Sequence, residues 1–499
     1  MHASSLRHLR KFFSGTFLSR LTGMVRDLTT VYFFGAHPSV AAFLAAFRFS
    51  NVARRLLGEG PFQSAFIPHF EQLRTLGREK DFFRQMNALF VFVLLIFVVG
   101  GEILVGVLSS LPSTSSFTIE MLQLMRFLLP GMFFISLYGL NISFHHCHHS
   151  FFIPSFSPAI CNFIWIGVIL LMRDQPAPFA MSVLAKGVFL GYLGQWLLTL
   201  PLILRERAGG FEWKISPEIW KFLKFVSLTI IGVGAVQINT LFDTVFAIKA
   251  DPRGVTYLWN SLRLEQFVLA LFGMGAVSTL VPKLTRAVKG GQIQKAQEIF
   301  EFCLKRLLLI LIPCTFATCI LGRSAVSLLY EHGKFTLFDV GQTALCLFGY
   351  GFGIIPTVLV MLYSAVFYAK NRALYPSLLA VGMMGLNIGL NAFFVMGLQL
   401  GTVSVAIATS ICAWIHAGIF AHKLWKEGWR VQNTLWFRLT LVSLAASVCV
   451  PAGHFVLQAG IFSLAISVFA YLFRCRELIH FILSFLFIRA IDKNPSESR

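Results

Sequence analysis

Long apolar runs recur from one end of the chain to the other, and short basic or glycine-containing segments separate them. Most runs have about 18 residues or more, close to the ~20 helical residues that cross a hydrocarbon core about 30 Å thick. Backbone at that depth is either helical or closed into a barrel, and the runs lack the alternation of barrel strands. We therefore expect fourteen transmembrane helices, at residues 12–35, 39–68, 87–111, 121–144, 154–172, 183–204, 222–248, 255–282, 304–322, 338–368, 376–396, 402–421, 439–457 and 460–488.

The composition supports a membrane protein. Hydrophobic residues make up 56% of the 499 positions and charged residues 13%, and the mean hydropathy is +0.73. A soluble domain has about 25% charged residues, so this chain has too little polar surface to cover itself in water. The composition excludes a soluble enzyme, a nucleic-acid-binding module and a disordered chain. An all-α polytopic membrane protein remains.

The formal charge of +20 is explained by basic residues in the loops on one side of the membrane. With the N-terminus in the cytoplasm, the loops on the outer side hold few basic residues, and the inner loops hold most of the rest. The outer set is Arg173, Lys249, Arg253, Arg323 and Lys334. Cytoplasmic loops are enriched in Lys and Arg, so both termini are predicted to be cytoplasmic. Nucleic acid is not needed to explain the charge, and we expect none as a partner.

Two halves of the chain show a weak repeat at an offset of about 214 residues. The segment AFIPHF at residues 65–70 corresponds to TLVPKL at residues 279–284, and Asp27 corresponds to Asp243. This pattern predicts an N-terminal six-helix lobe (1–204), a cytoplasmic linker (205–221), a C-terminal six-helix lobe (222–421) and a C-terminal helix pair with a tail (422–499). Six helices are an even number, so the repeat is parallel, as in several alternating-access transporters.

Arginines inside the predicted spans are the main candidates for function. Each costs about 2.5–3.5 kcal/mol at the centre of a membrane helix, so it faces a cavity, pairs with an acid or reaches the interface. In the first two spans five arginines meet two acids, Asp27 and Glu59. The surplus positive charge predicts a cavity that holds a strongly anionic group such as a phosphate, which guanidinium groups bind in a bidentate way. We assign Arg20, Arg54 and Arg263 to this cavity. For Arg26 beside Asp27 a local ion pair is the alternative, and for Arg48, Arg55 and Arg126 it is an interfacial position.

Other candidate chemistry is sparse. The nine cysteines form no CxxC pair and are expected to be core residues. The run HHCHH at residues 145–149 is interpreted as a lightly charged interfacial loop, with a zinc or copper site as the alternative. No GxxxxGK[ST] loop occurs, so ATP is not the expected energy source. No nucleophile with an assigned base stands out, so we expect neither an enzyme nor a cofactor.

Several segments near the N-terminus carry a resemblance to a known family. They are SRLTGMVRD at residues 19–27, FGA at 34–36, FRFSNVARR at 47–55, GEGPF at 58–62 and AFIP at 65–68. Together with IPSFSP at 153–158, Asn162 and Arg263, they resemble the lipid II flippase family (MurJ/MviN) of the multidrug/oligosaccharidyl-lipid/polysaccharide exporter superfamily. The resemblance covers residues 8 to 460, and it is specific mainly in the N-terminal block.

The resemblance implies a fourteen-helix transporter in the bacterial cytoplasmic membrane that serves peptidoglycan synthesis, cell-wall biogenesis and cell shape. Its substrate would be lipid II, the undecaprenyl-diphosphate-linked precursor, moved from the inner to the outer leaflet by alternating access. Arg20, Arg26, Arg54 and Arg263 match the essential cavity arginines of the family, and Glu59 matches their acidic partner. We expect a monomer that contacts lipid II, membrane lipids and cell-wall synthesis or division proteins.

The chain departs from the family pattern at several acids. Val40-Ala41-Ala42 stands where an acid is usual near the start of span two, and Leu262 stands where an Asp is common. Some relatives bind sodium through an acid in span seven and an Asn/Asp pair in span eleven. Here the corresponding residues are Asp243, Asn387 and Asn391, and the missing carboxylate weakens such a site. Coupling to sodium or to the membrane potential is therefore left open.

Two other functions remain as alternatives at this point. One is export of another anionic lipid-linked oligosaccharide on the same fold. The other is a polyprenyl-phosphate-using membrane glycosyltransferase, which would need acidic residues in a sizeable outer loop, and the outer loops here are short.

Overall fold

The computed structural model describes residues 2–57, 61–112, 114–270, 275–429, 434–473, 475 and 477–479, and within them every long element is helical. Nine helices in this described part are long and apolar enough to cross a membrane, and shorter apolar helices cover Pro38–Ser50 and Trp436–Val448. The predicted all-α, multi-pass class is confirmed. By contact, the chain divides into two compact units, which are described separately.

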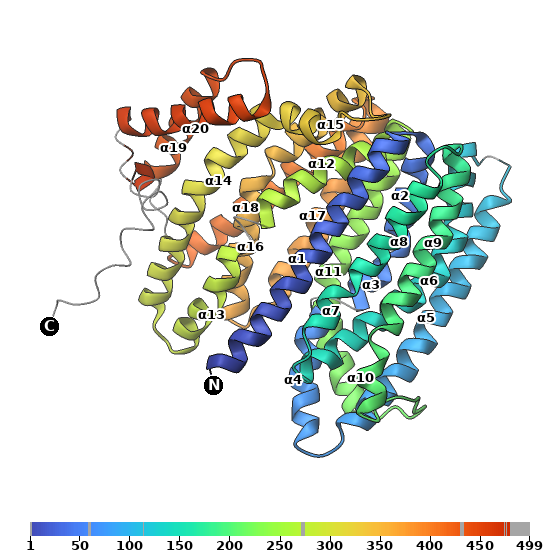
Figure 1. The fold of residues 1–499 in the computed structure, drawn as a ribbon. Helices are drawn as coiled ribbons and strands as arrows, with labels where there is room; N and C mark the ends of the chain where they lie inside the picture. Colours follow the sequence, from blue (N-terminus) through green and yellow to red (C-terminus); the bar gives the residue numbers. More distant parts are fainter. Residues whose placement is uncertain are drawn as a thin grey trace. The chain divides into compact units, whose positions relative to one another are not determined.

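The first unit contains residues Met1–Thr256 together with His332–Thr336. Its helices are α1 (His2–Phe34), α2 (Pro38–Ser50), α3 (Val52–Leu57), α4 (Pro61–Arg74), α5 (Glu79–Ser109), α6 (Ser116–Cys147), α7 (Phe152–Phe156), α8 (Pro158–Leu171), α9 (Ala177–Leu197), α10 (Leu200–Arg205) and α11 (Pro217–Ala250). Helix α6 packs on α2, α5 and α9, and α8 packs on α1 and α9 (Figure 1). Phenylalanines fill one core of this unit, where Phe66 packs against Phe62, Phe70 and Phe222.

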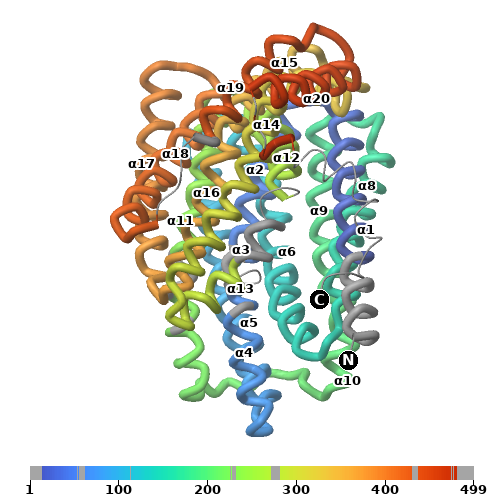
Figure 2. Tube along the Cα trace, turned by 90° about the vertical axis from the view of Figure 1, so that its left-hand side faces the viewer, coloured from blue at the N-terminus to red at the C-terminus, as the bar shows by residue number. Residues whose placement is uncertain are grey.

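The second unit contains residues Tyr257–Glu331 and Leu337–Arg499. Its helices are α12 (Gly254–Val268, which begins in the first unit), α13 (Gly275–Lys289), α14 (Ile293–Tyr330), α15 (Leu337–Gly351), α16 (Ile354–Ala369), α17 (Leu374–Asn391), the π-helical turn η2 (Ala392–Gly397), α18 (Val403–Lys426), α19 (Thr434–Val448) and α20 (Phe455–Leu472). Helix α16 packs on α13, α14 and α18, and α20 packs on α14 and α19 (Figure 2). Side chains of α14 and α16, most of them aliphatic, form about half of its core.

Several predicted spans are interrupted in the structure. The expected continuous helix at 39–68 is wrong at Asn51: α2 ends at Ser50, Asn51 caps it, and α3 begins at Val52. The expected span at 338–368 is confirmed as one long apolar stretch, Leu337–Ala369, within which the structure separates α15 from α16. At the break a Cβ on Gly353 would lie 2.7 Å from Ser410 Oγ, so the backbone approaches α18 closely there.

The two compact units do not divide at the predicted linker. Helix α11 belongs to the first unit because it packs on α2, α3, α4 and α5, and the boundary follows at Thr256. The loop 206–216 between α10 and α11 lacks regular structure but is held by Gln85, whose Nε2 donates to Glu212 Oε1 at 2.9 Å. The parallel repeat and its lobe boundaries stay a prediction. Residues 480–499, which include the end of the predicted last span, lie outside the described residues.

Candidate functional site

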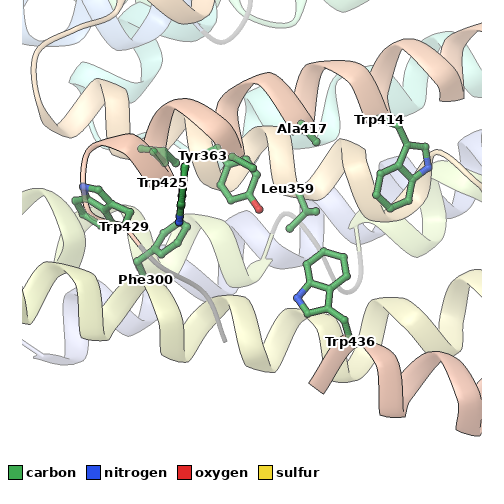
Figure 3. Close-up of a pocket in the computed structure, with 11 residues that line it drawn as sticks. Phe300, Leu359, Tyr363, Trp414, Ala417, Trp425, Trp429 and Trp436 are labelled. Atoms are coloured by element: carbon green, nitrogen blue, oxygen red, sulfur yellow. The ribbon is translucent and has the colours of Figure 1, made fainter. Parts of the chain in front are cut away.

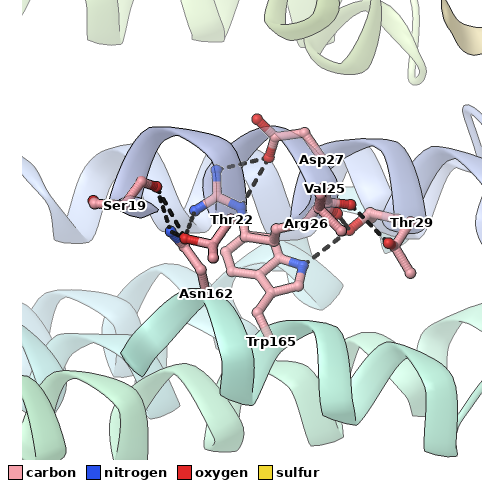
Figure 4. A network of polar contacts seen from close by, with 9 residues as sticks. Ser19, Thr22, Val25, Arg26, Asp27, Thr29, Asn162 and Trp165 are labelled. Atoms are coloured by element: carbon pink, nitrogen blue, oxygen red, sulfur yellow. Dashed lines mark hydrogen bonds and ion pairs between the residues drawn. The ribbon is translucent and has the colours of Figure 1, made fainter. Parts of the chain in front are cut away.

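Arg26 lies at the centre of a buried polar network on α1 (Figure 4). Its Nε and Nη2 donate to Asp27 Oδ1 at 2.9 and 2.7 Å, and its Nη1 donates to Asn162 Oδ1 on α8 at 3.0 Å. The guanidinium lies over the ring of Trp165, 4.5 Å from its centroid. Arg26 and Asp27 are each only 8% exposed. The guanidinium fork is therefore occupied largely by this chain's own oxygens, which is the local pair left open by the sequence.

Asn162 and Trp165 extend the network across the α1–α8 contact. Asn162 Nδ2 donates to the backbone oxygen of Ser19 and to Thr22 Oγ1, both at 3.1 Å. Trp165 Nε1 donates to Thr30 Oγ1 at 2.9 Å. A buried network whose groups are satisfied holds its members in one geometry. Arg26 is thus fixed relative to α8, and Asp27 compensates its charge.

Arg20 and Arg54 lie in different surroundings from Arg26. Arg20 is on the same helix, six residues earlier, and its side chain is exposed. Arg54 is half-buried on α3, close to Asn51, whose Nδ2 donates to Tyr192 Oη at 2.7 Å. Glu59, the predicted acidic partner, lies outside the described residues. Arg20 therefore presents an exposed guanidinium on α1.

Arg48 and Arg55 both reach α11. Arg48 Nη1 donates to Thr244 Oγ1 at 3.1 Å, and Arg55 Nη1 donates to Gln237 Oε1 at 3.2 Å. The sequence does not predict these contacts with α11, because Thr244 and Gln237 lie more than 180 residues from the arginines.

In the second unit, Arg263 lies on α12 and its guanidinium carbon is 4.7 Å from the ring centroid of Trp259, one turn earlier. Glu265 is buried on the same helix, at 7% exposure. Tyr257 Oη donates to Asp339 Oδ1 on α15 at 2.9 Å, and both residues are buried. The sequence analysis missed Glu265 and Asp339, although an acid near or inside an apolar run is itself a signal.

The residues predicted for a sodium site form hydrogen bonds of their own. Asn391 Nδ2 donates to Asn387 Oδ1 at 2.8 Å, and Asn387 Nδ2 donates to Thr409 Oγ1 on α18 at 3.4 Å. These bonds use oxygens that a hard cation would need. Asp243 belongs to the first unit, where it accepts a bond from Asn239 Nδ2 at 3.2 Å. The amide pair is thus hydrogen-bonded within the second unit, and a sodium site at these residues stays a prediction.

The histidine run at 145–149 is part of the packed structure. Helix α6 continues to Cys147, so the expected loop is wrong for residues 145–147. His145 is fully buried, and its Nε2 lies 2.9 Å from the backbone oxygen of Thr199. His148 stacks on Phe144 with the ring centroids 4.2 Å apart. Within the described residues, no group of three or more His, Cys, Asp or Glu side chains is placed to hold a metal ion.

A separate cavity of about 380 Å³ lies in the second unit (Figure 3). Its walls are mainly aromatic and come from α14, α16, α18 and α19. The aromatic lining residues are Phe300, Tyr363, Trp414, Trp425, Trp429 and Trp436. This lining offers no charged side chain, so the cavity suits a hydrocarbon group and not a diphosphate.

Comparison with known proteins decides the family. The family model "Lipid II flippase MurJ" matches residues 30–476. A probable lipid II flippase MurJ of Chlamydia muridarum is 33% identical over 414 residues, which are 82% of this chain and 77% of that protein. The chain belongs to the MurJ family. A probable lipid II flippase MurJ of Vibrio cholerae is 27% identical over 455 residues, covering 86% of this chain and 85% of that protein.

Solved structures agree with MurJ membership at the level of the fold. A lipid II flippase MurJ in an inward closed conformation matches with a TM-score of 0.80 and 23% identity, covering 94% of this chain and 99% of that one. An inward-facing MATE transporter of the MOP superfamily matches with a TM-score of 0.67 and 16% identity, covering 82% and 94%. The MurJ family match includes Arg54 and Arg263, whereas Arg20, Arg26 and Asp27 precede it.

Proposed function

We propose that this chain transports lipid II from the inner to the outer leaflet of the bacterial cytoplasmic membrane. The observation that carries the proposal is its membership of the MurJ family, whose curated relatives are named probable lipid II flippases. The arginines on α1, α3 and α12 add the chemistry that a diphosphate-linked substrate needs. A transporter also accounts for the absence of an assigned nucleophile in the sequence, so we do not pursue the glycosyltransferase alternative.

In the proposed mechanism Arg20, Arg54 and Arg263 supply guanidinium groups for the diphosphate, and the Arg26 network keeps α1 and α8 in register. A polar head group crosses a membrane slowly by itself because each charge loses its water in the hydrocarbon core. A transporter exposes the bound head group to the two sides in turn while the lipid chain stays in the bilayer. The exposed Arg20 is suited to direct contact, whereas Arg26 is suited to positioning.

We further propose that both termini are cytoplasmic and that the membrane potential drives transport. The inner loops carry most of the basic residues, in agreement with the positive-inside rule. An inside-negative potential is worth about 2.3 kcal/mol per charge per 100 mV, which favours outward movement of an anion. Coupling to sodium through Asp243, Asn387 and Asn391 is the weaker proposal because the amide pair already binds itself. We expect a monomer that contacts cell-wall synthesis or division proteins.

Complementation tests this function. Bacteria depleted of their own lipid II flippase are supplied with the wild-type chain or with Arg20→Ala, Arg54→Ala or Arg263→Ala, at equal membrane levels. Arg173→Ala is the control, because Arg173 is an exposed outer-loop arginine paired with Asp174. We expect rescue by the wild type and the control and loss of rescue in the other three variants.

Each other outcome has a defined meaning. Rescue by all variants would keep lipid II transport and remove the assigned role of the three arginines. If a correctly inserted wild-type chain fails to rescue growth, lipid II is rejected as the substrate, and another anionic lipid-linked oligosaccharide becomes the next substrate to test.

A further inference from the structure

A second cavity, of about 610 Å³, lies at one end of the second unit and is not part of the site described above. Its walls come from the C-terminal end of α14, the start of α15, the α19–α20 loop and the first turns of α20. Figures 1 and 2 show α20 beside this end of α14, in agreement with the packing of the two helices. Unlike the aromatic cavity, this one is lined by charged, hydroxyl and amide groups.

The α14 wall carries both a positive and a negative side chain. Arg323 is exposed, and Glu331 follows eight residues later as the residue that ends the helix. Ser327 Oγ lies between them in sequence and donates to Glu331 Oε2. Eight residues of helix correspond to about 12 Å along the axis, and both Arg323 and Glu331 line the cavity. This spacing suits a ligand that is itself zwitterionic.

The opposite wall adds groups of both kinds. His454 is the N-cap residue of α20, and its side chain makes no capping bond. The first N–H groups of a helix have no intrahelical acceptor and favour an anion. Gln458 is 7% exposed; its Nε2 donates to the Pro451 backbone oxygen at 2.8 Å, and its Oε1 has no hydrogen-bond partner among the described residues. A donor from a ligand or a water would satisfy this buried oxygen beside the cavity and would remove a cost of about 1–3 kcal/mol.

Large apolar side chains surround these polar groups. Leu328, Leu337 and Val456 line the cavity and are 52%, 65% and 76% exposed. Such exposure is expected where side chains face lipid, and the three helices involved are apolar over most of their length. The cavity thus lies where apolar helices end, which is where lipid head groups are found. A lipid explains the polar lining and the apolar rim together, whereas a soluble zwitterion explains only the lining.

We propose that this cavity binds the head group of an aminophospholipid of the surrounding membrane. The phosphate contacts Arg323 and the N-terminus of α20 beside His454. The ammonium group donates to Gln458 Oε1 and contacts the Glu331 carboxylate. The acyl chains leave over Leu328 and Val456. This site is independent of the proposed transport of lipid II, because it uses none of the arginines assigned to that substrate.

Lipid binding to the purified full-length chain in detergent tests the proposal directly. The probes are phosphatidylethanolamine, phosphatidylglycerol and phosphatidylcholine with identical acyl chains. Phosphatidylglycerol lacks the ammonium group, and phosphatidylcholine lacks its N–H donors. We expect phosphatidylethanolamine to bind most tightly and Arg323→Ala to weaken it about tenfold or more, as for loss of a charge-assisted hydrogen bond. Arg173→Ala, the matched exposed arginine, should leave binding unchanged.

Glu331→Gln separates the two ends of the head group. It should weaken phosphatidylethanolamine binding and leave phosphatidylglycerol binding as it is, because only the first lipid has an ammonium group. Equal affinity for all three lipids in the wild type would overturn the proposal. Unchanged phosphatidylethanolamine affinity in Arg323→Ala would overturn it as well. Displacement of the lipid by soluble glycerophosphoethanolamine at similar concentrations would assign the cavity to a soluble zwitterion instead.

Discussion

The first unit contains two pairs in which an Asp directly follows an Arg, and the two pairs have different surroundings. Arg26 and Asp27 lie inside the α1–α8 contact with side chains 10% and 9% exposed, and their shortest N–O distance is 2.7 Å. Arg173 and Asp174 lie between α8 and α9 with side chains 57% and 85% exposed, and their distance is 3.2 Å. The first guanidinium also contacts Asn162 and Trp165.

The comparison shows that surroundings, and not residue type, set the importance of an ion pair. An exposed pair contributes about 0–1 kcal/mol because water and salt screen it. Removing one partner of a buried pair destabilises by about 3–5 kcal/mol, because the other charge stays buried without compensation. The buried pair therefore need not be strongly stabilising as a whole, but neither half can be removed alone.

The largest expected effect is on Asp27. Asp27→Asn leaves the Arg26 charge buried without its carboxylate partner, so we expect a loss of about 3–5 kcal/mol and a strongly reduced yield of folded protein. Asp174→Asn should change stability by less than about 1 kcal/mol. Thermal unfolding in detergent, read from tryptophan fluorescence, compares the two. Equal melting temperatures would contradict the contrast between the pairs.

Asn162 tests the rest of the buried network. Asn162→Ala removes an acceptor of Arg26 and two bonds to α1, so we expect a loss of about 2–3 kcal/mol. Asn141→Ala is the matched control, because Asn141 is also buried in this unit but makes a single bond, from Nδ2 to Thr199 Oγ1 at 2.8 Å. The control should lose about 1 kcal/mol. The same unfolding assay measures both, and a larger loss for Asn141→Ala would refute the ranking.

Two glycines with positive φ also differ in their surroundings: Gly333 lies against other backbone atoms, and Gly291 has open space beside it. Gly333 has a φ of +64°, and a Cβ there would lie 2.1 Å from the backbone oxygen of Tyr32, the oxygen that accepts from the Lys334 N–H at 2.9 Å. Gly291 has a φ of +72° and nothing within 4 Å. We expect Gly333→Ala to lose roughly 2 kcal/mol and Gly291→Ala about 1 kcal/mol, the cost of the left-handed backbone alone. If both variants lower the melting temperature equally, the backbone near Tyr32 moves away from the added Cβ without a further loss of stability.

Hydropathy predicted where most helices lie, because burial in lipid requires long apolar segments whatever the tertiary contacts. It did not predict the break at Asn51, where a side chain bonded to Tyr192 replaces helix continuity. It also did not predict that α11 packs on α3 and α4, because this packing depends on contacts between distant parts of the chain.

The candidate site was predictable only in part for a similar reason. An arginine in an apolar helix is visible in the sequence, and so is an adjacent aspartate. The partner that fixes Arg26 is Asn162, which lies 136 positions away and is one of many polar residues in the spans. Likewise nothing in the sequence pairs Tyr257 with Asp339, although each lies next to an apolar run. Long-range side-chain partners arise from the fold and not from local pattern.

The smallest expected effect concerns Glu427, whose exposure lies between those of the two Arg–Asp pairs. Its Oε2 accepts from Lys370 Nζ at 2.6 Å and its Oε1 from Arg372 Nη1 at 3.0 Å, and its side chain is 20% exposed. Burial raises the pKa of this carboxyl, but the bond and charge of Lys370, together with Arg372, outweigh it and hold the pKa below its ordinary value. A lowered folded-state pKa means that the unfolded chain binds the proton more tightly.

The stabilisation from Glu427 is therefore complete above about pH 4.5, the ordinary value for a glutamate. It is lost as the pH falls below that value and through the lower folded-state pKa. We expect the melting temperature of Glu427→Gln to lie slightly below that of the wild type at pH 7, by the equivalent of less than about 1 kcal/mol, and to approach it as the pH falls below about 4.5. Parallel curves over this range would mean that protonation of Glu427 does not break the contact. If the free energies of unfolding of the wild type and Glu427→Gln differ by several kcal/mol at pH 7, Glu427 behaves like the buried pair at Arg26. The measurement therefore shows whether a side-chain exposure of 20% is enough to weaken an ion pair in this protein.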